Sequence, residues 1–212
     1  MDEAARKDAL LAAMLPDVPF DGWTWAAMRA AAHRIAMADL ELRALFPAGP
    51  RGLIAWFSHW ADRLTLETMA ARPLEGMKAS DRIALGVRTR LALLAPHREA
   101  VRRGLALLAL PQSAALAARL LYDTVDALWY AAGDRATDFS FYTKRGILAG
   151  IYAAATLYWL DDRSPDFAAT EAFVERRLRE VSVLPRFKAR AERALDAVPN
   201  PFRILRMARP RL

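Results

Sequence analysis

The chain has 212 residues, of which 55% are hydrophobic and 26% charged, with a formal net charge of +7 and no cysteine. This length and composition suit one folded medium-sized domain, or a small module fused to a larger one. The lack of cysteine excludes disulfide bonds, thiolate metal sites and cysteine nucleophiles. The first residues, Met-Asp-Glu-Ala-Ala-Arg, resemble neither a signal peptide nor a transit peptide, and we therefore expect a cytoplasmic protein.

Helical periodicity runs through nearly the whole chain, and no alternating run typical of a β-strand is present. The apolar pattern, with Pro and Gly as boundaries, predicts helices at about 3–14, 24–33, 38–45, 50–71, 80–94, 97–109, 112–131, 138–160, 165–183, 186–197 and 201–209. The longest apolar run, 146–160, is shorter than the roughly 20 residues that span a bilayer, so we expect no membrane crossing.

The helices predicted between 22 and 47 are similar in spacing to the helix-turn-helix of TetR-type regulators. Such a motif reads DNA with a basic or small polar helix in the major groove. Here the second helix carries Asp39 and Glu41 on its exposed side, and carboxylates repel phosphates. The turn position that is usually glycine is Ala36. Arg29, Arg34 and Arg43 remain candidate phosphate contacts, but the sequence favours a helix-turn-helix kept as a scaffold.

Signals for catalysis and metal binding are weak. None of His33, His59 and His97 has Glu three residues before it, so the Glu-x-x-His pairs of di-iron helix bundles are missing. No Gly-x-Ser-x-Gly or Gly-Lys-Ser/Thr motif is present. An acid/base pair among the aspartates between 123 and 166 is an alternative, but their positions at turns and helix starts favour capping. We therefore predict no metal site, no catalytic residue and no enzyme.

Aromatic residues gather around the turn between the predicted helices 112–131 and 138–160. Trp129 and Tyr130 end the first helix, and Phe139, Phe141 and Tyr142 begin the second. Because neighbours on a helix diverge by about 100°, Phe141 and Tyr142 do not both point inward. Either one of them is exposed, which is typical of an interaction site, or both fill the corner between the helices.

The same two helices mix bulky and small residues. The positions that recur at helical spacing include Leu116, Leu120, Leu148, Ile151, Tyr152, Ala155 and Trp159. Mixed sizes permit either close helix packing or a cavity for an apolar ligand. The spacing alone favours plain core packing.

The end of the chain is basic, since residues 186–212 carry +6 of the net charge of +7. After Pro201 an apolar stripe lies beside arginines: Phe202, Arg203, Leu205, Arg206 and Arg209. A basic amphipathic helix is typical of membrane-surface contact, and each basic residue near an anionic surface contributes about 1 kcal/mol. The alternative is a helix that docks on the body of the protein.

Short motifs follow a fixed order between 125 and 167: Val125-Asp126, Trp129, Ala132-Gly133-Asp134, Thr137-Asp138-Phe139, Tyr142-Thr143, Arg145, Ile151-Tyr152 and Ser164-Pro165-Asp166-Phe167. In this order and spacing they resemble the COQ9 family of ubiquinone-biosynthesis accessory proteins. The family has a TetR-like fold without DNA binding, which agrees with the acidic second helix. Its members form homodimers, hold an isoprenoid lipid and carry a C-terminal amphipathic helix.

The resemblance implies residue roles in this chain. It favours a ligand cavity over plain core packing at the positions that recur along the two helices. The lipid-binding residues would then be Leu116, Leu120, Leu148, Ile151, Tyr152, Ala155 and Trp159. A surface for the di-iron demethoxyubiquinone hydroxylase would comprise Asp126, Leu128, Trp129, Asp138, Phe141, Tyr142 and Arg145. Two positions depart from the family: Phe141 replaces Trp, and Leu128 replaces Met, a change of similar volume.

Together these inferences predict an all-α, TetR-regulator-like protein. We expect a degenerate helix-turn-helix module at 1–48, a helical lipid-binding and dimerisation domain at 49–184, and a basic membrane-contact segment at 185–212. The expected function is to bind isoprenoid quinone intermediates at the cytoplasmic face of the inner membrane and to present them to the hydroxylase. We expect no cofactor other than this lipid, and no DNA partner. The alternative is a TetR-type ligand-responsive transcriptional regulator.

Overall fold

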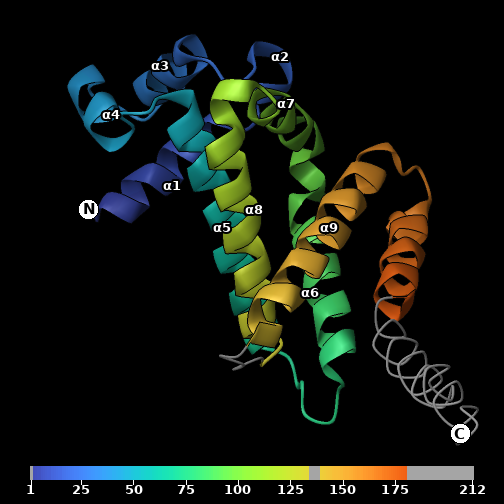
Figure 1. The fold of residues 1–212 in the computed structure, drawn as a ribbon. Coiled ribbons are helices and arrows are strands. Elements are labelled where there is room, and N and C mark those ends of the chain that lie inside the picture. The colour runs from blue at the N-terminus through green and yellow to red at the C-terminus, as the bar shows by residue number, and fades with distance from the viewer. Residues whose placement is uncertain (1, 134–138, 181–212) are drawn as a thin grey trace, which may run out of the picture.

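The computed structural model describes residues 2–133 and 139–180, and for residues 139–143 it describes the backbone alone (Figure 1). The regular elements in this part of the chain are all helical. They are α1 (Glu3–Met14), α2 (Val18–Asp21), α3 (Trp25–Arg34), α4 (Asp39–Leu45), α5 (Pro50–Ala70), α6 (Ala79–Leu94), η1 (Ala95–His97), α7 (Arg98–Leu108), η2 (Pro111–Ser113), α8 (Ala114–Ala131), α9 (Phe139–Asp161) and η3 (Pro165–Phe167). A further helix covers 168–180.

Helices α1 to α4 form a cluster at one end of α5 (Figure 1). Helix α1 packs on both α3 and α5, and its Leu10, Leu11 and Met14 are fully buried. Full burial of such a side chain contributes about 1.5–3 kcal/mol. Trp23 ties the cluster to α7, because its indole N–H donates a hydrogen bond of 2.9 Å to the carbonyl of Ala100.

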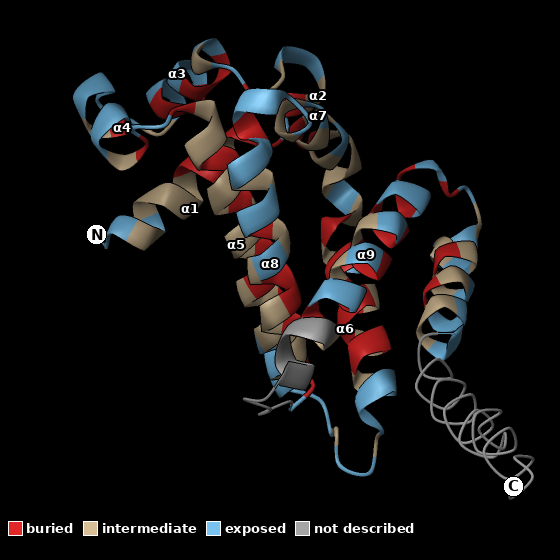
Figure 2. Cartoon of the chain, viewed as in Figure 1, coloured by how far each residue is buried: buried red, intermediate tan, exposed pale blue. Residues whose placement is uncertain are grey.

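Helices α5, α6, α8 and α9 pack around a common core, and α7 crosses one end of them (Figure 1). Figure 2 shows that the buried residues lie on the faces that these helices turn toward one another. Val87, Val125, Leu128 and Trp159 are at most 2% exposed. This core fixes the four helices whose inner faces form the site described below.

After α9 the chain turns back, and helix 168–180 runs beside it (Figure 1). The rings of Tyr158 and Phe173 stack at 4.9 Å, and Val174 is fully buried. An ion pair joins Arg88 of α6 to Glu171. Helix 168–180 therefore packs against the body of the protein through Glu171, Phe173 and Val174.

The helices predicted from periodicity agree with the structure within about two residues, with two exceptions. The one-turn helix α2 was not predicted, since four residues hold no period. The helix expected at 165–183 begins at 168, because Asp166 and Phe167 have φ of +51° and +58° and form the turn before it. The segments expected to be helical at 186–197 and 201–209 lie outside the described residues. The division at 48/49 and 184/185 remains a prediction.

Within the described ranges, no single helix is long and apolar enough to cross a membrane. The stretches Ala79–Leu108 and Pro111–Ala131 reach that length and composition only together, across a bend of 102°.

The turn between α3 and α4 has the hydrogen bonds of a helix-ending Schellman motif. The Met37 N–H donates to the Ala32 carbonyl at 2.9 Å, and the Ala36 N–H donates to the His33 carbonyl at 3.2 Å. Ala36 occupies the left-handed position with φ +52°. Glycine is favoured there, because a Cβ atom costs about 1–2 kcal/mol in that conformation.

Replacing Ala36, which is exposed, with glycine is expected to raise the free energy of unfolding. The expected gain is about 0.5–1 kcal/mol, since relief of strain is partly offset by the greater entropy of unfolded glycine. Urea denaturation measures the change. The matched control is Ala30→Gly, at an exposed position inside α3, which should lower stability by about 1 kcal/mol. A loss of stability in Ala36→Gly would contradict the strain argument.

Candidate functional site

A cavity of about 280 Å³ lies among α5, α6, α7, α8 and α9. Its wall is largely apolar, with Ile54 and Phe57 from α5, Leu94 from α6, Leu105 and Leu108 from α7, Leu120 and Leu121 from α8, and Leu157 from α9. Leu157 lines the cavity although 61% of it is exposed. The cavity therefore reaches the surface beside α9. A pocket of this size and lining suits part of a lipid rather than a small polar molecule.

One wall of the cavity carries a buried polar network centred on Arg90 of α6. Its Nε donates to the Asp62 carboxylate at 2.8 Å, and its Nη1 donates to the Tyr152 hydroxyl at 2.5 Å. Its Nη2 donates to the Ser58 carbonyl at 3.2 Å, to the Ser58 hydroxyl at 3.1 Å and to the Thr124 hydroxyl at 3.3 Å. Thr124 in turn donates to Asp62 at 3.2 Å. The network therefore joins α5, α6, α8 and α9.

The charges in this network balance each other. Arg90 is 5% exposed and Asp62 is 7% exposed. Burial opposes the charge on Arg90, but Tyr152 and Asp62 outweigh it and raise the pKa of the guanidinium. Burial likewise raises the pKa of Tyr152, although the nearby Arg90 opposes the shift. At neutral pH the wall therefore holds the Arg90–Asp62 ion pair and a neutral tyrosine hydroxyl. Its net charge is zero.

The structure places only part of the predicted lipid-binding stripe at the cavity. Leu120 and Tyr152 line it. Buried side chains away from the cavity wall are Leu148, Ile151, Ala155 and Trp159, and Leu116 is half-buried outside it. On α9 the cavity-lining residues include Ala153 and Leu157, which lie about 100° or more around the helix from the predicted stripe.

The contribution of α5, α6 and α7 to the cavity was missing from the sequence interpretation. One signal for it exists in the sequence. Ile83, Val87, Arg90 and Leu94 recur at i, i+4, i+7 and i+11, so Arg90 occupies a core position on an apolar helical face. A charged residue at such a position is buried only with a partner. The identity of that partner, 28 residues away, depends on the tertiary packing.

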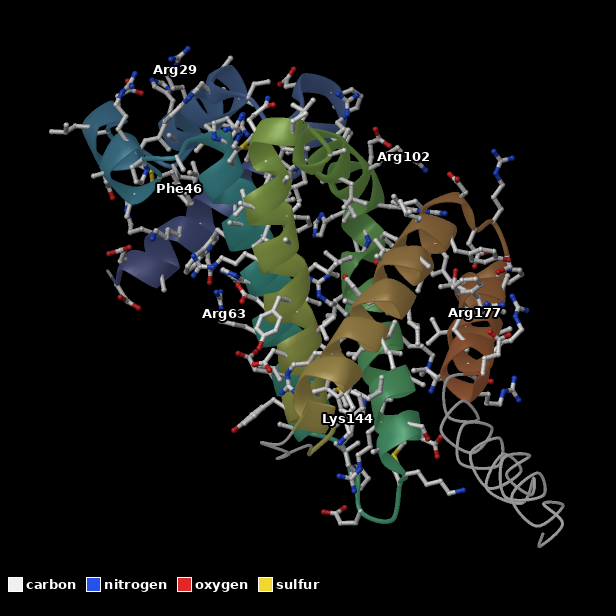
Figure 3. The ribbon with its side chains drawn as sticks, viewed as in Figure 1. Arg29, Phe46, Arg63, Arg102, Lys144 and Arg177 are labelled. Carbon is white, nitrogen blue, oxygen red and sulfur yellow. The ribbon has the colours of Figure 1, made fainter. Side chains whose placement is uncertain are left out.

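The predicted partner surface is partly described. The Arg145 Nε donates to the Asp126 carboxylate at 2.6 Å, and Arg145 is 5% exposed. Lys144 lies 5.5 Å from the ring centre of the half-buried Trp129 (Figure 3). Leu128 is 2% exposed, so it supports this surface from below. Tyr130, which was not in the predicted set, is 73% exposed.

The remaining predicted contacts fall on parts that the structure leaves out. Asp138 lies outside the described residues. Phe141 and Tyr142 lie in the first turn of α9, where only the backbone is described. The predicted membrane-contact residues also lie outside the described ranges: Phe202, Arg203, Leu205, Arg206 and Arg209. All of these assignments remain predictions.

The exposed face of the α3–α4 pair is poor in unpaired positive charge. In α4, Glu41 accepts two hydrogen bonds from Arg6 of α1, at 2.5 and 2.6 Å, and these bonds lower the pKa of Glu41. Arg43 lies 3.6 Å from Asp39, and Arg34 pairs with Asp17. Arg29 points away from the body at the exposed end of this cluster (Figure 3).

The Ser164–Phe167 motif forms a capping turn between α9 and helix 168–180. The Asp162 carboxylate accepts hydrogen bonds from the backbone N–H groups of Ser164 and Thr170, each at 2.8 Å, and from both hydroxyls, each at 2.6 Å. Burial alone would raise the pKa of Asp162, but these hydrogen bonds outweigh it and lower the pKa from 3.8 to about 2. The motif therefore has a structural role, because Ser164 and the adjacent Asp162 accept hydrogen bonds from the first backbone N–H groups of helix 168–180.

Other carboxylates of this region are also engaged. Asp123 lies 3.3 Å from His59, and Asp161 lies 3.1 Å from Arg102. In the part of the chain that the structure describes, no group of three or more His, Asp or Glu side chains is arranged to hold a metal ion.

The lowered pKa of Asp162 predicts an acid-sensitive contribution to stability. The carboxylate is favoured in the folded state, so its contribution is present above about pH 4 and is lost as the pH falls through about 2. Asp162→Asn is expected to lower the free energy of unfolding by about 2 kcal/mol at pH 7, with a smaller difference from the unsubstituted chain near pH 2. Chemical denaturation at several pH values measures both effects. Asp166→Asn, at an exposed position, is the control. Equal losses for the two variants would contradict the capping role.

Comparison with known proteins identifies relatives of the chain. The rat and human proteins named "Ubiquinone biosynthesis protein COQ9, mitochondrial" are each 32% identical to it over 177 residues. The matched region covers 81% of this chain, but only 57% of the rat protein and 56% of the human protein. The chain thus spans little more than half the length of these relatives.

These relatives correct the predicted localisation. The prediction of a cytoplasmic protein at the inner membrane is wrong, since the relatives are named mitochondrial proteins. That prediction rested on the composition of the first six residues. The start of a chain that spans only part of its relatives carries no information about targeting.

The fold and the family agree with the resemblance seen in the sequence. A solved TetR transcriptional regulator from Nitrosomonas europaea has a TM-score of 0.68, with 23% identity, over 84% of this chain and 98% of its own. This match confirms the predicted all-α, TetR-like fold. The COQ9 family model matches residues 114–185, which include α8, α9 and the capping turn. The chain is therefore a homologue of the COQ9 proteins, built on a TetR-like fold.

Proposed function

We propose that this chain is a lipid-binding accessory protein of ubiquinone biosynthesis that holds an isoprenoid quinone or its precursor in the cavity among α5–α9. The observation that carries the proposal is the cavity itself, which is apolar, opens beside Leu157 and bears one polar wall. The names of the relatives support a role in ubiquinone biosynthesis in mitochondria. The proposed role is binding and transfer, without turnover by the chain alone.

The physical need for such a protein follows from the solubility of the lipid. Each CH₂ group moved from a bilayer into water costs about 0.8 kcal/mol, so a polyprenyl chain does not leave the membrane unaided. The apolar wall of the cavity lowers that cost for the part that it encloses. At about 280 Å³ the cavity lies at the lower end of ligand-site volumes, so it encloses only one end of a long polyprenyl lipid. The rest would stay near the membrane.

Membrane contact and partner binding complete the proposal. The basic segment 185–212 would hold the protein at an anionic membrane surface. The surface around Asp126, Trp129, Arg145 and the first turn of α9 would bind the di-iron demethoxyubiquinone hydroxylase, and a homodimer would form the working unit. The Asp126–Arg145 ion pair and the Lys144–Trp129 contact give this surface a fixed shape.

Filling the cavity is expected to abolish lipid binding. Ala153 lines the cavity and is half-buried, whereas its neighbour Ala154 is exposed and does not line it. Ala153→Trp should weaken binding of a ubiquinone with two isoprene units by about 10-fold or more, because the indole occupies the ligand's space. Isothermal titration calorimetry measures the affinity. The matched control, Ala154→Trp, should bind like the unsubstituted chain. Equal affinity of both variants would place the lipid elsewhere.

Removing the aromatic pair at the start of α9 is expected to weaken hydroxylase binding. Aromatic residues at the centre of an interface each contribute about 2 kcal/mol or more. The double variant Phe141→Ala, Tyr142→Ala should therefore bind the hydroxylase at least about 10-fold more weakly in a pull-down titration. Tyr122→Ala removes an exposed ring of α8 outside the predicted surface and is the control. Unchanged binding of the double variant would remove this surface from the proposal.

A further inference from the structure

Among the described residues, two hydroxyls of the cavity's polar wall donate no hydrogen bond: that of the half-buried Ser58 and that of the more deeply buried Tyr152. Thr124 donates to Asp62, and Thr156 donates to the Tyr152 carbonyl at 2.9 Å, so both hydroxyl hydrogens are engaged. The Tyr152 hydroxyl accepts from Arg90 and lies beside the Thr156 side chain, and no described residue accepts a hydrogen bond from it. Tyr152 lines the cavity and is 7% exposed. A buried hydroxyl without an acceptor favours a ligand that supplies one.

The charge behind that hydroxyl is already neutralised. Arg90 also lines the cavity, but its Nε already donates to Asp62 at 2.8 Å, and its Nη2 donates to Ser58 and Thr124. A second carboxylate or phosphate placed here would lose its water and face a guanidinium that is already paired. A neutral oxygen acceptor needs only one hydrogen bond, and it brings no charge to desolvate.

We propose that Tyr152, held by the Arg90–Asp62 pair, is a specificity-determining residue of the cavity and selects lipids whose head is neutral and carries a hydrogen-bond-accepting oxygen. The inference rests on the proposed lipid-binding function and adds to it the chemical class of the head. Ring carbonyl oxygens of a quinone meet this requirement. An acidic prenylated benzoate and a pure polyisoprenoid hydrocarbon do not, for opposite reasons.

This selection also places the ligand. The head lies inside the cavity against Tyr152, and the isoprenoid tail leaves beside the exposed Leu157. A single neutral hydrogen bond changes an affinity by only about 3- to 10-fold, so it orients the head without trapping it. The head is thus free to withdraw for transfer to a partner.

The first experiment removes the hydroxyl and keeps the ring. Tyr152→Phe should bind a ubiquinone with two isoprene units about 3- to 10-fold more weakly than the unsubstituted chain. Its affinity for squalene, which has no oxygen, should stay within about two-fold. Displacement of a fluorescent apolar probe measures both affinities, and circular dichroism verifies the fold. Tyr158→Phe, which removes the hydroxyl of the neighbouring, half-exposed tyrosine, should change neither value.

A purely structural role for Tyr152 would lower both affinities together, and that result would overturn the inference. An unchanged quinone affinity would overturn it too. If the unsubstituted chain binds neither ligand, the proposed function fails as well, and this outcome is distinct from the other two.

The second experiment needs no variant. A prenylated hydroxybenzoate and its methyl ester have the same ring and tail, but only the acid is charged at pH 7.5. The unsubstituted chain should bind the ester at least about 10-fold more tightly, because the buried site has no free cation for the carboxylate. Equal or tighter binding of the acid would overturn the inference.

Discussion

The packing of α5, α6, α8 and α9 depends on one buried guanidinium. Arg90 contacts Asp62 and Ser58 on α5, Thr124 on α8 and Tyr152 on α9, so a single side chain fixes the relative positions of four helices. Loss of either partner of a buried ion pair costs about 3–5 kcal/mol, because the other charge is left uncompensated. Replacing a buried ion pair by apolar residues of similar volume is often neutral for stability, but here it would remove the polar wall of the cavity. The same Arg90 network thus joins the four helices and supplies the polar wall of the cavity.

Much of the fold was predictable because helical periodicity is local. The boundaries of α3, α5 and α8 follow from Pro, Gly and the apolar period. The turn before α4 is also marked in the sequence, because Ala36 stands at a position that usually holds glycine and has a positive φ. The cavity was less predictable, since it forms between helices that lie up to about 100 residues apart in sequence. The predicted stripe marks the packed core of α9. The cavity lies on the adjacent face, where small Ala153 and exposed Leu157 gave no periodic signal.

The N-terminal helices combine the order of a helix-turn-helix with an acidic exposed surface on α4. The order and turn of α3 and α4 keep the helix-turn-helix geometry, and the TetR-like match covers most of the chain. The exposed start of α4 carries Asp39 and Glu41, and the nearest arginines pair with carboxylates of the same chain. Such a surface has little positive charge left for phosphates. Leu42 and Phe46, both at most 3% exposed, pack the inner side of this module.

The central claim is that an isoprenoid quinone occupies the cavity among α5–α9. The most direct measurement is to purify the chain gently from its native host, extract it with organic solvent and quantify the extracted lipids by mass spectrometry. We expect about one isoprenoid quinone or precursor per chain, with a neutral oxygen-bearing head. A chain that yields no isoprenoid lipid and instead shifts a DNA duplex would contradict the claim and favour a TetR-type regulator.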